Sequence, residues 1–201
     1  MNIDGMIYYS QFFQDYFLNK EIFKNKLNGT FIEFGAWDGI DKSNTYFFEK
    51  EMNWAGTCIE PIPGMFNKLK ENRKCECLFG AIVPENIVQT DFLLNTGHNG
   101  MNSGIKGLVE EFRLKIFTTI QVPTFNLNDI LEKYDEIDYL SIDIDGGEFE
   151  IIKSIDFESN KINVITIENC NNNLTVYDYM LTNNYKYFGR LFVDDIYLRK
   201  Q

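Results

Sequence analysis

Residues 30–60 read TFIEFGAWDGIDKSNTYFFEKEMNWAGTCIE, and this stretch decides the fold. Residues 30–34 are short and apolar, which predicts a buried strand, and residues 35–39 form a turn bounded by glycines. Residues 43–52 predict a helix, and residues 54–59 predict a second strand. A strand, a turn, a helix and a strand in this order are typical of a parallel βαβ unit.

The same alternation continues along the chain, without an internal repeat or a Pro/Ser-rich linker. Further strands are expected at 75–83, 87–94, 117–122, 137–145, 163–168, 185–190 and 191–199, and helices at 9–27, 64–72, 126–133, 147–154 and 174–182. The last two strands predict a hairpin. The sequence therefore predicts a Rossmann-like α/β fold: a mostly parallel seven-stranded sheet with a reversed last strand and helices on both faces.

The composition limits the classes of function. The chain has 201 residues, of which 44% are hydrophobic and 15% aromatic, enough for one domain with a packed core. Its net charge is −11 and its basic residues are scattered, which disfavours nucleic acid and favours a neutral or cationic substrate. No apolar run reaches the roughly 18–20 residues that span a bilayer, and the first residues do not resemble a secretory signal. We therefore expect a cytoplasmic protein without a membrane span.

The cysteines do not form a recognised metal motif. Cys58, Cys75, Cys77 and Cys170 lack the paired C-x₂-C spacing that zinc usually requires. We expect them to be reduced and structural.

Two acidic residues flank the first βαβ unit. Glu33 precedes a G-x-x-x-G turn, which differs from the G-x-G-x-x-G loop of dinucleotide enzymes and leaves room for a nucleoside with an amino-acid tail. Glu60 ends the second strand, where a carboxylate can accept hydrogen bonds from ribose hydroxyls. The alternatives are an ordinary βα turn with a surface acid at Glu33, and a solvated acid capping the next helix at Glu60.

A third strand end carries several acids. Asp143 and Asp145 point to the same side of the predicted strand, and burying two carboxylates is costly unless they bind something. Glu148 falls in the first turn of the next helix, where it is as well explained by the helix dipole as by catalysis. Glu168 ends another strand that would face the same crevice. Asp194 lies in a pair of acids that we interpret as a turn or a solvated edge.

The only histidine, His98, lies in the polar loop 95–107. A general base with an ordinary pKa near 6.5 is one interpretation, and a solvent-exposed loop histidine is the other.

These pieces form an ordered set along nearly the whole chain. They are Ser10-Gln11 with Gln14-Asp15, FIEFGAWDG (31–39) with Ser43-Asn44-Thr45, Ile59-Glu60-Pro61, SIDIDGGE (141–148), Ile167-Glu168-Asn169 and DDIYLRK (194–200). With them the chain resembles the FkbM family of S-adenosylmethionine-dependent methyltransferases. The resemblance implies a single class I methyltransferase domain over 1–201, with a helical lead-in (1–28) and a variable substrate-side insertion (84–123). This domain can be one part of a longer protein, with a glycosyltransferase as a fused or associated partner.

The resemblance also implies the cofactor and its site. S-adenosylmethionine would be held by Gln14, Glu33, Gly35, Ala36, Trp37, Asp38, Gly39, Asn44, Glu60, Pro61, Ala81, Ile82 and Asp143. Within this set, Glu60 takes the ribose hydroxyls, Ala81 and Ile82 flank the adenine, and Asp143 lies between the cofactor and the acceptor.

The implied reaction is O-methylation of a sugar or glycan, with a non-sugar natural product as the alternative acceptor. Asp143 is the first candidate for the general base and His98 the second, while Glu168 orients the acceptor. A divalent cation such as Mg²⁺ at Asp143 and Asp145 is kept as a hypothesis. An NAD-dependent enzyme and a non-catalytic nucleotide-binding module are the competing classes, and the missing G-x-G-x-x-G loop argues against the former.

Overall fold

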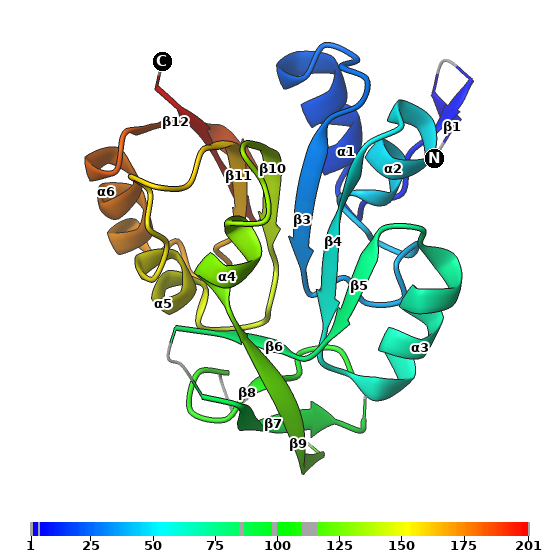
Figure 1. Ribbon diagram of the computed structural model, residues 1–201, viewed down its shortest axis with the longest axis vertical. Coiled ribbons are helices and arrows are strands. Elements are labelled where there is room, and N and C mark those ends of the chain that lie inside the picture. Colours follow the sequence, from blue (N-terminus) through cyan, green and yellow to red (C-terminus); the bar gives the residue numbers. More distant parts are fainter. Residues whose placement is uncertain (1, 4, 85–86, 98–99, 110–115, 201) are drawn as a thin grey trace.

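The computed structural model describes residues 2–3, 5–84, 87–97, 100–109 and 116–200, and its centre is a seven-stranded sheet (Figure 1). The strands lie in the order β12-β13-β11-β10-β3-β4-β5. Their bounds are β3 Thr30–Phe34, β4 Ala55–Glu60, β5 Glu76–Phe79, β10 Ile137–Ile142, β11 Ile162–Glu168, β12 Tyr185–Leu191 and β13 Asp194–Arg199.

The α/β class and the seven strands agree with the expectation, but the sheet is mixed rather than mostly parallel. The ladders from β11 through β10, β3 and β4 to β5 are parallel. The last strand, β13, is reversed as expected, and it pairs antiparallel with both of its neighbours, β11 and β12. Two of the six ladders are therefore antiparallel.

Helices cover both faces of this sheet. The helices are α1 Gln14–Phe17, π-helix η1 Leu18–Ile22, α2 Tyr46–Met52, α3 Pro63–Asn72, α4 Leu127–Leu131, α5 Glu148–Lys153 and α6 Leu174–Thr182. Alternate side chains of β3 pack into two different hydrophobic cores, one on each face of the sheet, because successive side chains of a strand point to opposite faces. Ile32 packs in a cluster with α4, α5 and α6, whereas Phe31 packs in a cluster with η1, α2 and α3.

A second, smaller sheet was not expected. It has the order β6-β9-β7-β8, with β6 Ala81–Val83, β7 Gln89–Asn95, β8 Gly104–Ile105 and β9 Phe117–Asn126. A short hairpin of β1 (Asn2–Ile3) and β2 (Met6–Ile7) precedes it in the chain. Figure 1 shows the second sheet below the carboxyl ends of β3 and β4.

The predicted strand 75–83 is two strands. Gly80 has φ +153°, and a Cβ at this position would lie 2.5 Å from the Pro123 carbonyl oxygen. The chain turns here from β5 in the main sheet to β6, which pairs with β9. The break brings Ala81 and Ile82 over the carboxyl end of the main sheet.

The predicted helix 9–27 is much shorter. The Asp15 carboxylate accepts hydrogen bonds from the backbone nitrogens of Tyr9 (2.6 Å) and Ser10 (3.2 Å), and Phe13 has φ +63°. These contacts hold residues 9–13 outside the helix, which starts only at Gln14. A side-chain carboxylate that binds nearby backbone competes with helix formation.

Candidate functional site

A cavity of about 270 Å³ opens at the carboxyl ends of the central strands. The chain runs outward from β3 to β4 and β5 and then returns to β10 on the other side of β3. This is the topological switch point, where ligands of open α/β sheets bind. The lining residues come from the ends of β3, β4, β10 and β11, from β6 to β8, and from Gln11, Asp41, Lys42 and Ser43.

The turn after β3 is built for close approach. Gly35 has φ +74°, and a Cβ on it would lie 1.8 Å from the Asp143 carbonyl oxygen. The backbone nitrogens of Gly35 and Ala36 both donate to the Ile59 carbonyl at 3.1 Å. Only glycine adopts this conformation in this space. The turn thus brings the ends of β3, β4 and β10 together at the cavity.

Glu60 is a buried carboxylate in the cavity wall, with 2% of its surface exposed. One of its oxygens accepts from the Trp37 nitrogen and the other from the Ile62 nitrogen, each at 2.8 Å. Burial raises the pKa of Glu60 to about 8, although the two backbone hydrogen bonds oppose the shift. The side chain is therefore fixed in position and largely neutral at pH 7.

Asp143 faces the same cavity and is exposed within it. Among the described residues, none donates a hydrogen bond to its carboxylate. Desolvation of the carboxylate by the surrounding protein raises the pKa of Asp143 well above its usual range. The negative charges of Glu168, Asp194 and Asp145 add to the shift. A carboxylate with a raised pKa is a stronger base than an ordinary aspartate.

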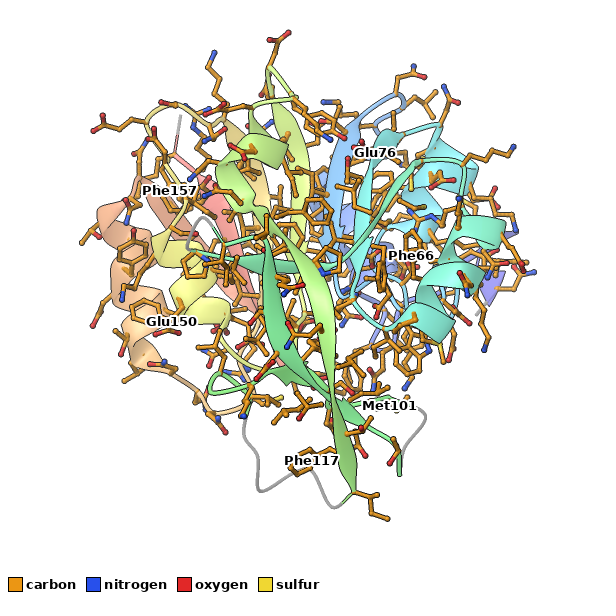
Figure 2. The ribbon with its side chains drawn as sticks, turned by 60° about the horizontal axis from the view of Figure 1, so that its bottom comes forward. Phe66, Glu76, Met101, Phe117, Glu150 and Phe157 are labelled. Carbon is orange, nitrogen blue, oxygen red and sulfur yellow. The ribbon has the colours of Figure 1, made fainter. Side chains whose placement is uncertain are left out.

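A second cavity of about 180 Å³ adjoins the first and shares Asp145, Gly146 and Glu168 with it. Its wall also contains Glu148 and Glu150, and the described residues contribute no basic side chain to it. Burial raises the pKa of Glu148 to about 7, although its hydrogen bonds with backbone nitrogens oppose the shift. In Figure 2, Met101 of the first cavity and Glu150 of the second lie on opposite sides of β9.

Glu33 lies outside the cavity lining and has protein partners. Its carboxylate accepts from the Ser43 hydroxyl (2.9 Å), the Asn44 backbone nitrogen (2.7 Å) and the Thr45 hydroxyl (2.6 Å). The Arg73 guanidinium forms an ion pair with it at 3.3 Å. Glu33 therefore holds segment 43–45, which leads from the cavity wall into α2.

Arg73 is a residue that the sequence did not single out. Its side chain is fully buried, and it forms a second ion pair with Glu49 at 2.6 Å. The guanidinium also lies over the rings of Phe31 and Tyr46. Its partners come from β3, segment 43–45 and α2, so no local pattern in the sequence marks it.

The other predicted residues fall into three groups. Trp37, Pro61, Ala81 and Ile82 line the first cavity with the residues above. Four other predicted residues do not line it, namely Asp38, Gly39, Asn44 and Gln14. Asp38 accepts hydrogen bonds from the backbone nitrogens of Ile40 and Asp41, and Gly39 packs on Leu69 and Arg73. The Asn44 side chain donates to Ser141, and the Gln14 side chain donates to Asp194. His98 lies outside the described residues.

The hypothesis of a metal at Asp143 and Asp145 finds little support. Asp145 accepts a hydrogen bond from the Asn102 backbone nitrogen at 3.0 Å. Within the described part of the chain, no group of three or more His, Cys, Asp or Glu side chains is arranged to hold a metal ion.

In the same part of the chain, no helix has the length and apolar character needed to cross a bilayer.

The sequence and the fold of this chain are both similar to those of known proteins. The family model described as methyltransferase FkbM domain matches residues 33–187. The chain is similar to precorrin-6y C5,15-methyltransferase from Geobacter metallireducens GS-15, with a TM-score of 0.52 and 14% identity over 100% of this chain and 94% of that chain. It is also similar to the N-terminal domain of human METTL16 in complex with SAH, with a TM-score of 0.45 and 12% identity over 92% and 65% of the two chains. No curated protein sequence matches the chain.

Proposed function

Because the chain belongs to the methyltransferase FkbM domain family, we propose that it transfers a methyl group from S-adenosylmethionine to a hydroxyl group of a sugar or glycan. One observation carries the proposal. The Gly35 turn, the buried Glu60 and the carboxylate of Asp143 all line one cavity at the switch point of the sheet.

The cavity fits a nucleoside with an amino-acid tail. Two backbone hydrogen bonds hold the Glu60 carboxyl group at the end of β4, and we assign it to the ribose hydroxyls. Ala81 and Ile82 are buried and apolar, and they flank the adenine. The backbone of residues 35–37 faces the amino-acid tail. Glu33 and Asn44 support this wall through segment 43–45 rather than by contact with the ligand.

When bound, S-adenosylmethionine supplies an electrophilic methyl group. Asp143 in its ionised form accepts the proton of the acceptor hydroxyl, and in that form its raised pKa makes it a stronger base. Glu168, which lines both cavities, orients the acceptor. Holding the reacting oxygen in line with the methyl group contributes much of the rate, because orientation is worth roughly 7–11 kcal/mol.

The second cavity is our candidate for the acceptor site. Its carboxylates, those of Glu148, Glu150 and Glu168, provide hydrogen-bond acceptors for neutral hydroxyl groups. Its acidic wall disfavours phosphorylated or carboxylated acceptors, because like charges repel. A neutral sugar has many hydroxyl groups and no negative charge, so it meets both of these conditions.

A turnover screen with S-adenosylmethionine tests this proposal. Mono- and oligosaccharides are compared with small phenols, and methylated products are identified by mass spectrometry. Methylation of sugars that is lost in Asp143→Asn supports the proposal. Turnover only on phenols would contradict the sugar acceptor, and turnover on nitrogen groups would contradict O-methylation.

A further inference from the structure

Two cysteine sulfurs lie close together away from the cavities. Cys58 is in β4 and fully buried, and Cys75 is half-buried just before β5. Their Sγ atoms are 3.6 Å apart, across 17 positions of sequence. Both thiols are free. A disulfide needs a sulfur separation of about 2.05 Å, so only about 1.5 Å of approach separates the pair from a bond.

The surroundings of the pair favour a reactive thiolate at Cys75. The buried Arg73 guanidinium is two positions away in sequence, and Cys77 also lies next to Cys75. Hydrogen bonding with Cys58 and with Cys77, together with the charge of Arg73, lowers the pKa of Cys75 to about 3. Burial raises the pKa of Cys58, which keeps that sulfur protonated. The two sulfurs thus have different roles available to them.

We propose that Cys75 and Cys58 form a peroxide-reactive site, in which Cys75 is the attacking sulfur and Cys58 the resolving sulfur. The proposal rests on the sulfur distance, the difference in burial and the neighbouring guanidinium. It does not depend on methyl transfer. The partner is a small hydroperoxide, which reaches Cys75 from its exposed side.

The chemistry balances in two steps. The Cys75 sulfur attacks one oxygen of the peroxide, the O–O bond breaks, and hydroxide or alkoxide leaves with a sulfenic acid formed at Cys75. The Cys58 sulfur then attacks the Cys75 sulfur, forming the S–S bond and breaking the S–O bond. The leaving hydroxide takes the Cys58 proton and departs as water. The peroxide gains the two electrons that the two sulfurs lose.

The new bond would form beside the network that supports the first cavity. Cys58 Sγ lies 3.7 Å from a Glu33 carboxylate oxygen, and Glu33 holds segment 43–45. Cys58 also precedes Glu60 by two positions in β4. The new bond would therefore join β4, whose carboxyl end contributes Glu60 to the first cavity, to the segment just before β5.

Peptide mapping of the native wild-type protein tests the site. The protein is treated with hydrogen peroxide, its remaining thiols are alkylated after unfolding, and it is digested with trypsin. We expect peptide 51–68, which contains Cys58, to be joined to peptide 75–106, with the mass loss of two hydrogen atoms. Fragment ions assign the link to Cys75 rather than Cys77. The same treatment in concentrated guanidinium is the control, and it should give mixed pairings.

Two variants separate the roles. In Cys58→Ser, the sulfenic acid has no resolving partner and should be trapped at Cys75 by dimedone. In Cys77→Ser, the Cys58–Cys75 link should still form. The proposal is overturned if the native protein is oxidised mainly at the exposed Cys170, or if the link joins Cys75 to Cys77.

Discussion

Glu60 shows at the scale of one residue how burial sets a measurable property. Its pKa rises from the ordinary value of 4.5 to about 8. Between these values, the folded protein keeps a proton that the unfolded chain releases, so raising the pH favours unfolding. Glu148 (about 7) and Asp194 (about 6) act in the same direction. Cys75, whose pKa is lowered to about 3, acts in the opposite direction, because the folded form lacks a proton that the unfolded chain keeps. The three raised carboxyl groups outnumber it, so stability should still fall as the pH rises from about 5 to about 8.

Glu60→Gln tests this at one position. In wild type, we expect the free energy of unfolding in urea to be lower at about pH 8 than at about pH 5 by a few kcal/mol. The substitution removes one backbone hydrogen bond, because the amide nitrogen of Gln cannot accept, so absolute stability also falls, but the dependence on pH should become flatter. Glu148→Gln, at a half-buried position, serves as the comparison and should flatten it less. An unchanged slope in Glu60→Gln would contradict the raised pKa.

Asp143 is the residue that we propose as the proton acceptor in methyl transfer. Asp143→Asn removes the proton acceptor but keeps the shape of the side chain, so turnover should fall more than tenfold. Affinity for S-adenosylhomocysteine, measured by calorimetry, should change less than threefold. If affinity and turnover fall together, Asp143 binds the cofactor rather than acting as the base.

Several candidate site residues can be placed near one another from the sequence alone. Gly35, Glu60 and Asp143 end neighbouring strands, and parallel strands end at one edge of the sheet. Glu33 also lies near this edge, but it binds Arg73 and segment 43–45 instead of lining the cavity. That difference depends on an arginine 40 positions away, which no local pattern reveals.

The Gly35 turn is the element on which the cavity depends. Gly35→Ala should destabilise the protein by about 2–4 kcal/mol, because φ is +74° and the new Cβ would lie 1.8 Å from a backbone oxygen. Gly64→Ala in α3 is the control, since nothing lies within 4 Å of its Cβ position. Urea unfolding should find Gly64→Ala neutral or slightly stabilised. Equal effects in the two variants would contradict the role of the turn.

Arg73 joins elements that are distant in sequence. Arg73→Met should cost about 3–5 kcal/mol, because it leaves the carboxylates of Glu33 and Glu49 buried without their counter-charge. Lys133→Met, which removes an exposed pair with Glu76, should cost less than about 1 kcal/mol. Chemical denaturation measures both. If Arg73→Met lowers the free energy of unfolding only slightly, the ion pairs of Arg73 contribute little to stability.

Elements with strong local signals were predicted well, and those set by distant contacts were not. The strand over residues 30–34 and the helix over 174–182 agree with β3 and α6. The helix predicted over 9–27 is helical only over residues 14–22, and it starts late because Asp15 binds the preceding backbone. The strand over 75–83 divides at Gly80, where the chain changes sheets.

At the scale of the whole molecule, the order of motifs predicted the α/β class and the edge that bears the cavity. The second sheet could not be foreseen, because its pairing joins β6 to a strand about 40 positions later. This sheet supplies Ala81, Ile82 and Phe92 to the cavity. Segment 84–123, which we expected to be a variable insertion, contributes Phe92 and Ile105 to the wall of the first cavity.

Calorimetric titration with S-adenosylmethionine and S-adenosylhomocysteine, on wild type and Glu60→Ala, tests the central claim most directly. We expect micromolar binding to wild type and at least tenfold weaker binding to the variant, because the ribose hydroxyls lose their partner. Circular dichroism confirms that the variant is folded. Absence of binding to either ligand by the wild-type protein would contradict the proposed methyltransferase activity.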